Sequence, residues 1–109
     1  MKINYSVNWV LQKVFAIIFL ISFVYFLYSL RDISLNNFFE ISNWFSIKAN
    51  SILFLILFSS IILHSNIGLN SIIDDYIHEE NNKKMIIILK NSLFVIIYIT
   101  VLLSIISIS

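Results

Sequence analysis

Residues 51–73 read SILFLILFSSIILHSNIGLNSII, and they decide the fold of this 109-residue chain. The stretch has no Asp, Glu, Lys or Arg between Lys48 and Asp74, and its apolar body runs from Ile52 to Ile73. A helix of about 20 mainly apolar residues crosses a hydrocarbon core about 30 Å thick. Residues 51–73 therefore predict a transmembrane helix.

Two further apolar stretches flank this one. The first lies between Lys13 and Arg31, and the last begins around Met85 and is uncharged from residue 91 onward. The apolar runs are continuous rather than alternating, which argues against a transmembrane β-barrel. We therefore predict an all-α membrane protein with a single domain, residues 1–109. Its three transmembrane helices are expected at about 12–30, 51–73 and 86–108.

The composition excludes several other classes of protein. Hydrophobic residues make up 60% of the chain and charged residues 12%, whereas a soluble domain has about 25% charged residues. Intrinsic disorder requires low hydrophobicity and high net charge. The absence of Cys excludes disulfides and cysteine-ligated iron–sulfur clusters. A net charge of +1 gives no electrostatic reason to expect nucleic-acid binding.

The basic residues predict the orientation, because cytoplasmic loops carry an excess of Lys and Arg. With the N-terminus inside and the C-terminus outside, five basic residues lie on the inner side and two on the outer side. The inner residues are Lys2, Lys13, Lys83, Lys84 and Lys90, and the outer ones are Arg31 and Lys48. The first stretch is long for the apolar region of a signal peptide, and no small-residue cleavage site follows it, so we expect it to be retained.

The segment between Arg31 and Lys48 is short and aromatic. Aromatic rings, Trp above all, are favoured at the headgroup level of a membrane. We therefore expect an interfacial connector there rather than a folded domain. Its aromatic residues are Phe38, Phe39, Trp44 and Phe45.

His64 lies in the middle of the second span, where an ionisable side chain is rare and indicates a functional site. A neutral imidazole is a good ligand for haem iron. The alternative is a structural hydrogen bond to a Ser or Asn of a neighbouring helix. Gly68 follows one turn later on the same face. Its missing side chain would allow a flat macrocycle, or another helix, to approach closely.

Tyr76 ends the second span, preceded by Asp74 and Asp75. Twelve residues separate it from His64, about 18 Å along a helix. Its phenol can donate a hydrogen bond to a carbonyl group, and a nearby carboxylate can orient it or relay a proton. The alternative is an ordinary interfacial aromatic residue beside solvated charges. Asp74 has no assigned role, and His78 is expected to be solvated.

The order and spacing of these residues resemble those of the smaller hydrophobic membrane anchor of succinate dehydrogenase, respiratory complex II. The resemblance is carried by His64-x3-Gly68 followed by Asp75-Tyr76, and by the upstream pattern Trp9-x2-Gln12-Lys13-x2-Ala16. It extends over essentially the whole chain. Two positions depart from the family pattern, since Lys13 stands in place of Arg and Phe15 in place of Thr.

The resemblance implies functions for five of these residues. His64 would be an axial ligand of a haem b that is shared with the second anchor chain, with Gly68 packed closely beside it. Tyr76, with Asp75 as its neighbour, would bind ubiquinone. Lys13 would lie near the haem propionates or the quinone, although Lys lacks the bidentate fork of Arg.

The implied protein is one subunit of a succinate:quinone oxidoreductase and carries none of the succinate chemistry itself. Its partners would be the cytochrome b anchor subunit, the iron–sulfur subunit and the flavoprotein subunit. It would lie in the lipid bilayer of a bacterial cytoplasmic membrane or of the mitochondrial inner membrane. Two other interpretations stay open at this point, a fumarate reductase anchor and a non-enzymatic structural or pore-forming membrane protein.

Overall fold

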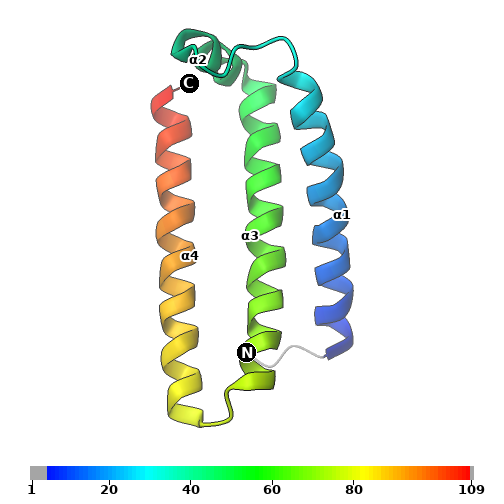
Figure 1. Cartoon of the computed structure of the whole chain (residues 1–109), viewed down its shortest axis with the longest axis vertical. Coiled ribbons are helices and arrows are strands. Elements are labelled where there is room, and N and C mark those ends of the chain that lie inside the picture. Colours follow the sequence, from blue (N-terminus) through cyan, green and yellow to red (C-terminus); the bar gives the residue numbers. More distant parts are fainter. Residues whose placement is uncertain (1–4, 109) are drawn as a thin grey trace.

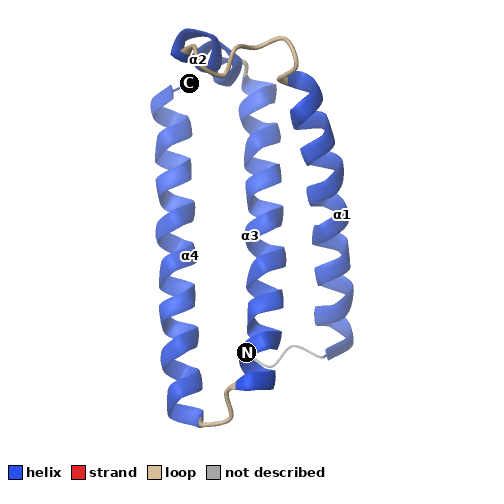
Figure 2. Cartoon of the chain, viewed as in Figure 1, coloured by secondary structure: helices blue, strands red, loops and turns tan. Residues whose placement is uncertain are grey.

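The computed structural model of the chain describes residues 5–108, and its regular structure within them is entirely helical (Figure 2). Three helices are long and apolar enough to cross a membrane, and they indicate a multi-pass membrane protein. This confirms the predicted all-α fold with three membrane-length helices. The four helices are α1 (Tyr5–Ser29), α2 (Phe38–Ser46), α3 (Lys48–Tyr76) and α4 (Glu80–Ile108).

The three long helices lie side by side in a single row, with α3 in the middle (Figure 1). Helix α3 contacts both α1 and α4, whereas no described residues of α1 and α4 approach each other. Because three helices alternate in direction, the start of α1 and the end of α4 lie at opposite ends of the molecule (Figure 1). The molecule measures 50 × 25 × 20 Å.

A single row buries little surface, because only the sides of the helices that face each other are covered. Four described hydrophobic residues are buried: Trp44, Leu57, Ile73 and Ile105. Elsewhere large apolar side chains are widely exposed on all three long helices, as expected of surfaces that contact lipid or partner helices.

The short helix α2 lies across one end of the row (Figure 1). It begins at the N-cap Asn37, whose side-chain oxygen accepts hydrogen bonds from the backbone N–H groups of Phe39 and Glu40. Trp44 is 4% exposed and packs edge-on against Phe26 of α1, with ring centroids 5.4 Å apart. The connector predicted from its aromatic residues is thus an ordered helix, and its Trp is part of the core rather than exposed.

Candidate functional site

His64 lies on the side of α3 that faces α1. Its Nδ1 is 3.0 Å from the main-chain oxygen of Gln12. A carbonyl oxygen only accepts hydrogen bonds, so Nδ1 is the donor, and in the neutral ring the lone pair then lies on Nε2. Nε2 makes no hydrogen bond to any residue in the described part of the chain. A fixed Nδ1–H with an available Nε2 is the arrangement typical of a metal-binding His.

Gly68 meets α1 at the same residue. A Cβ atom placed on Gly68 would lie 3.2 Å from Nε2 of Gln12. The space beside Gly68 is therefore filled by the Gln12 side chain, one turn from the point where His64 binds the Gln12 carbonyl. Gln12 thus contacts α3 at both His64 and Gly68, which its place in the sequence pattern alone does not reveal.

Lys13 follows Gln12 but points elsewhere. Its side chain is exposed, and its ammonium lies 5.7 Å from the centre of the Trp9 ring, a cation–π contact. The structure therefore brings His64 and Gly68 together around Gln12, whereas Lys13 contacts Trp9.

Asp75 and Tyr76 lie at the far end of α3. Tyr76 is the last residue of the helix and is 80% exposed, and Asp75 is exposed as well. Asp74 pairs with Lys83 across the α3–α4 turn at 3.4 Å, which accounts for the residue that had no assigned role. Because α3 is one continuous helix, His64 and Tyr76 stay about 18 Å apart along it. They form two separate sites rather than one.

A polar cluster that the sequence reasoning missed lies on the opposite side of α3. Lys90 of α4 is 8% exposed and donates hydrogen bonds to Oδ1 of Asn66, at 2.6 Å, and to Oδ1 of Asn70. From the sequence alone, Lys90 is only one of the positive charges that predict the topology. Two Asn residues four apart in one span, with a Lys inside the next span, were the available signal.

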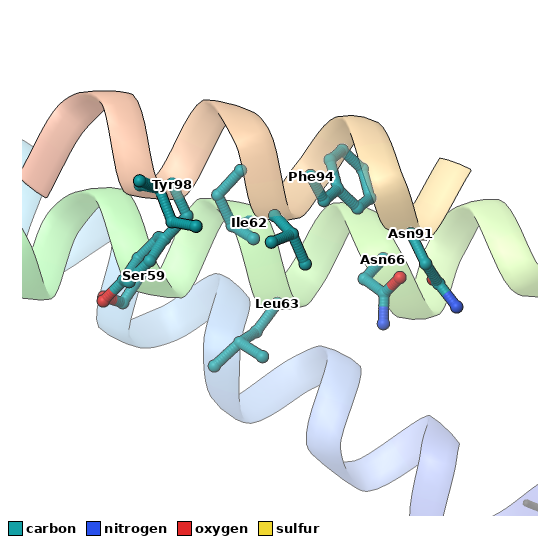
Figure 3. Close-up of a pocket in the computed structure, with 9 residues that line it drawn as sticks. Ser59, Ile62, Leu63, Asn66, Asn91, Phe94 and Tyr98 are labelled. Carbon is teal, nitrogen blue, oxygen red and sulfur yellow. The ribbon is translucent and has the colours of Figure 1, made fainter. Parts of the chain in front are cut away.

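A pocket of about 550 Å³ opens between α3 and α4 beside this cluster (Figure 3). Asn66 and Asn91 lie at one end of it, and at the other end the hydroxyl groups of Ser59 and Tyr98 are hydrogen-bonded at 2.7 Å. The wall between the two polar ends is apolar, formed by Ile62, Leu63, Phe94, Val95 and Ile99. A second pocket of about 300 Å³ lies between α1 and α3. His64 lines neither pocket.

No protein-family model matches the chain, and neither a curated protein sequence nor a solved structure shows significant similarity to it. Within residues 5–108, no group of three or more His, Cys, Asp or Glu side chains is placed to hold a metal ion.

Proposed function

We propose that the chain is the smaller membrane anchor of a succinate:quinone oxidoreductase, in a bacterial cytoplasmic membrane or the mitochondrial inner membrane. The observation that carries the proposal is the environment of His64. A His inside a membrane-spanning helix has its Nδ1–H held by a backbone carbonyl and its Nε2 available. This tautomer and orientation suit an axial ligand of haem iron.

The donor set fits a haem b shared between two chains. His64 is the single His within the three spans, so a second axial His would come from the cytochrome b anchor subunit. Neither pocket of this chain is lined by His64, so a haem bound there would have to be enclosed by the partner chain. When bound, the haem would supply one-electron transfer within the membrane. Gln12 orients the imidazole, while Lys13 is an exposed cation on the next position of α1.

Tyr76 and Asp75 are proposed to contribute to ubiquinone binding at the inner end of α3. The exposed phenol of Tyr76 can donate a hydrogen bond to a quinone carbonyl, and Asp75 supplies a carboxylate beside it. With the N-terminus inside, this end also presents the basic residues Lys83 and Lys84. The iron–sulfur and flavoprotein subunits would dock there and complete the quinone site.

Reduced and oxidised difference spectra of the complex, expressed with its partner anchor, test the role of His64. His64→Ala should weaken or shift the low-spin b-type bands, because the iron would lose one axial ligand. His78→Ala is the matched control, since His78 is exposed in the α3–α4 turn. A spectrum left unchanged by His64→Ala would remove His64 as a ligand.

The quinone role is tested separately, by comparing two electron acceptors. Tyr76→Phe should impair ubiquinone reduction and spare succinate oxidation by a soluble artificial acceptor, because it removes one hydrogen-bond donor at the quinone. Tyr25→Phe is the control, since Tyr25 is also an exposed tyrosine but lies near the C-terminal end of α1, at the opposite end of the molecule from Tyr76. An equal fall in both activities would indicate an assembly defect instead.

A second candidate function is supported by the same hydrogen bond. The bond between His64 and Gln12 joins α1 to α3, and this is sufficient for a purely structural membrane protein. In that case the complex would show no b-type spectrum, and His64→Ala would lower only the stability of the α1–α3 contact.

A further inference from the structure

Lys90 is a positively charged residue within the apolar part of α4. Within residues 5–108, no Asp or Glu forms an ion pair with it. Lys90 lies ten residues into α4 and five residues after Met85, where the apolar run begins, so about 7–8 Å inside that run. All six acidic residues occur in residues 32–40 and 74–80, outside the apolar part of the spans. The groups that accept hydrogen bonds from the ammonium, Asn66 and Asn70, are neutral amides. A charge at this depth is costly, and such residues typically pair with an opposite charge.

The two hydrogen bonds to Lys90 also determine how the Asn66 amide is turned. An ammonium only donates, so Oδ1 of Asn66 faces Lys90 and its NH₂ group points away. Asn66 and Asn91 both line the α3–α4 pocket, and Figure 3 shows their amides next to each other with the nitrogen atoms directed to the same side. Neither NH₂ group is bonded to a residue within 5–108. This end of the pocket therefore presents hydrogen-bond donors beside a positive charge.

We propose that the α3–α4 pocket docks a transmembrane helix of another protein that carries an Asp or Glu at the depth of Lys90. The carboxylate accepts hydrogen bonds from the NH₂ groups of Asn66 and Asn91 and offsets the charge of Lys90. The apolar side chains of the partner helix fill the pocket between these amides and the Ser59–Tyr98 hydrogen bond. This interface is independent of the haem and quinone sites and of the function proposed for them.

The shape of the pocket favours a helix as its occupant. Its lining residues recur along α3 from Ser59 to Asn66 and along α4 from Asn91 to Ile99, so the groove follows both helix axes for about 10–12 Å. A third helix packs naturally into such a groove between two others. A second copy of this chain has no carboxylate at the required depth.

Docking can be measured with the full chain in phosphatidylcholine vesicles and synthetic polyleucine transmembrane helices as probes. The probes carry a single Asp, Asn or Leu at the depth of Lys90 and a cysteine for disulfide crosslinking. The chain has no native Cys, so Val95→Cys reports on the pocket alone. Leu93→Cys is the matched control, because Leu93 is equally exposed but lies on the opposite side of α4.

The Asp helix should crosslink to Val95→Cys about tenfold more than the Leu helix, with the Asn helix between them. Leu93→Cys should show no such preference. Lys90→Gln should reduce the preference for Asp to that for Asn. Lys84→Gln should leave the preference unchanged, because Lys84 is exposed in the second turn of α4. Asn91→Leu removes an exposed donor without disturbing Lys90, and it should also weaken capture of the Asp helix.

Several outcomes would overturn the proposal. Equal capture of the Asp and Leu helices, or a preference that survives both Lys90→Gln and Asn91→Leu, would show that the cluster recognises no carboxylate. Loss of capture when phosphatidylglycerol is added would assign the pocket to an anionic lipid. Crosslinking of two Val95→Cys chains in the absence of any probe would assign it to self-association.

Discussion

Replacing Asn66 and Asn70, whose amides bind Lys90, is expected to destabilise the contact between α3 and α4. The loss should be larger than in a variant in which Lys90 is replaced together with both Asn residues. In Asn66→Leu/Asn70→Leu the ammonium loses both hydrogen-bond acceptors that the structure shows for it. Lys90 is 8% exposed, so water cannot readily replace them. An unpaired charge buried in an apolar environment is costly.

Two kinds of measurement bracket the size of the effect. A hydrogen bond to a charged group contributes about 1.5–3 kcal/mol to stability in soluble proteins, which places two such bonds at about 3–6 kcal/mol. Polar pairs within membranes average about 0.6 kcal/mol, because the unfolded helices find other partners in the bilayer. Lys90 is charged but has a long side chain that can reach toward the membrane surface when released. We therefore expect a loss of about 2–4 kcal/mol, between the two limits.

The assay is reversible unfolding in mixed micelles by increasing the fraction of dodecyl sulfate, followed by circular dichroism. The informative comparison is the triple variant Asn66→Leu/Asn70→Leu/Lys90→Met, which replaces the whole cluster by apolar side chains. Replacing a buried polar network entirely is often neutral, whereas removing one side of it is strongly destabilising. The triple variant should therefore recover most of the stability lost in the double variant.

Asn91→Leu serves as the control, because Asn91 is exposed and bonded to no residue of the described chain. Its effect should stay within about 0.5 kcal/mol, as for most surface substitutions. The reasoning is refuted if the triple variant is less stable than the double variant. That result would mean that the Lys90 side chain stabilises the helix pair by packing. It would also mean that hydrogen bonds to the Asn amides do not stabilise the buried ammonium.

Two other substitutions test the contacts on the α1 side. Trp44→Ala should cost about 3–5 kcal/mol in the same unfolding assay, because it removes a buried ring that joins α2 to Phe26; a loss below about 1 kcal/mol would show that α2 is not part of the core. Gly68→Ala should be tolerated, because the added Cβ meets only the flexible end of Gln12, whereas Gly68→Leu should push α1 away and cost about 1–3 kcal/mol. Equal effects of Ala and Leu would mean that α1 does not approach Gly68 closely.

The prediction of three membrane-length helices succeeded because it depends on composition alone. Each span is a long run of apolar residues whose charges, apart from Lys90, lie near its ends, and no Pro interrupts any of them. Helix ends were less predictable. Helix α1 begins at Tyr5 and α4 at Glu80, several residues before the apolar runs, because nothing in the polar flanks stops a helix. Trp44 was predicted only as part of an interfacial connector, and its burial by rings of α1 and α2 could not be predicted from the sequence.

The candidate sites separate in a similar way. His64 was identified from its position within an apolar span, and the hydrogen bond to Gln12 that orients it could not be predicted because it joins residues 52 positions apart. Asn66 and Asn70 are polar residues that do not by themselves predict a site. Their importance follows from Lys90, which α4 places against them.

The sequence by itself determined that the chain is helical and membrane-spanning, because the bilayer requires long apolar segments whose backbone hydrogen bonds are satisfied within each helix. Only the tertiary structure decided which faces of those helices meet. All three spans are apolar on every side, so their sequences contain no amphipathic stripe that marks a neighbour. Contacts between specific polar groups instead identify the neighbours, with His64 facing Gln12 of α1 and Asn66 facing Lys90 of α4.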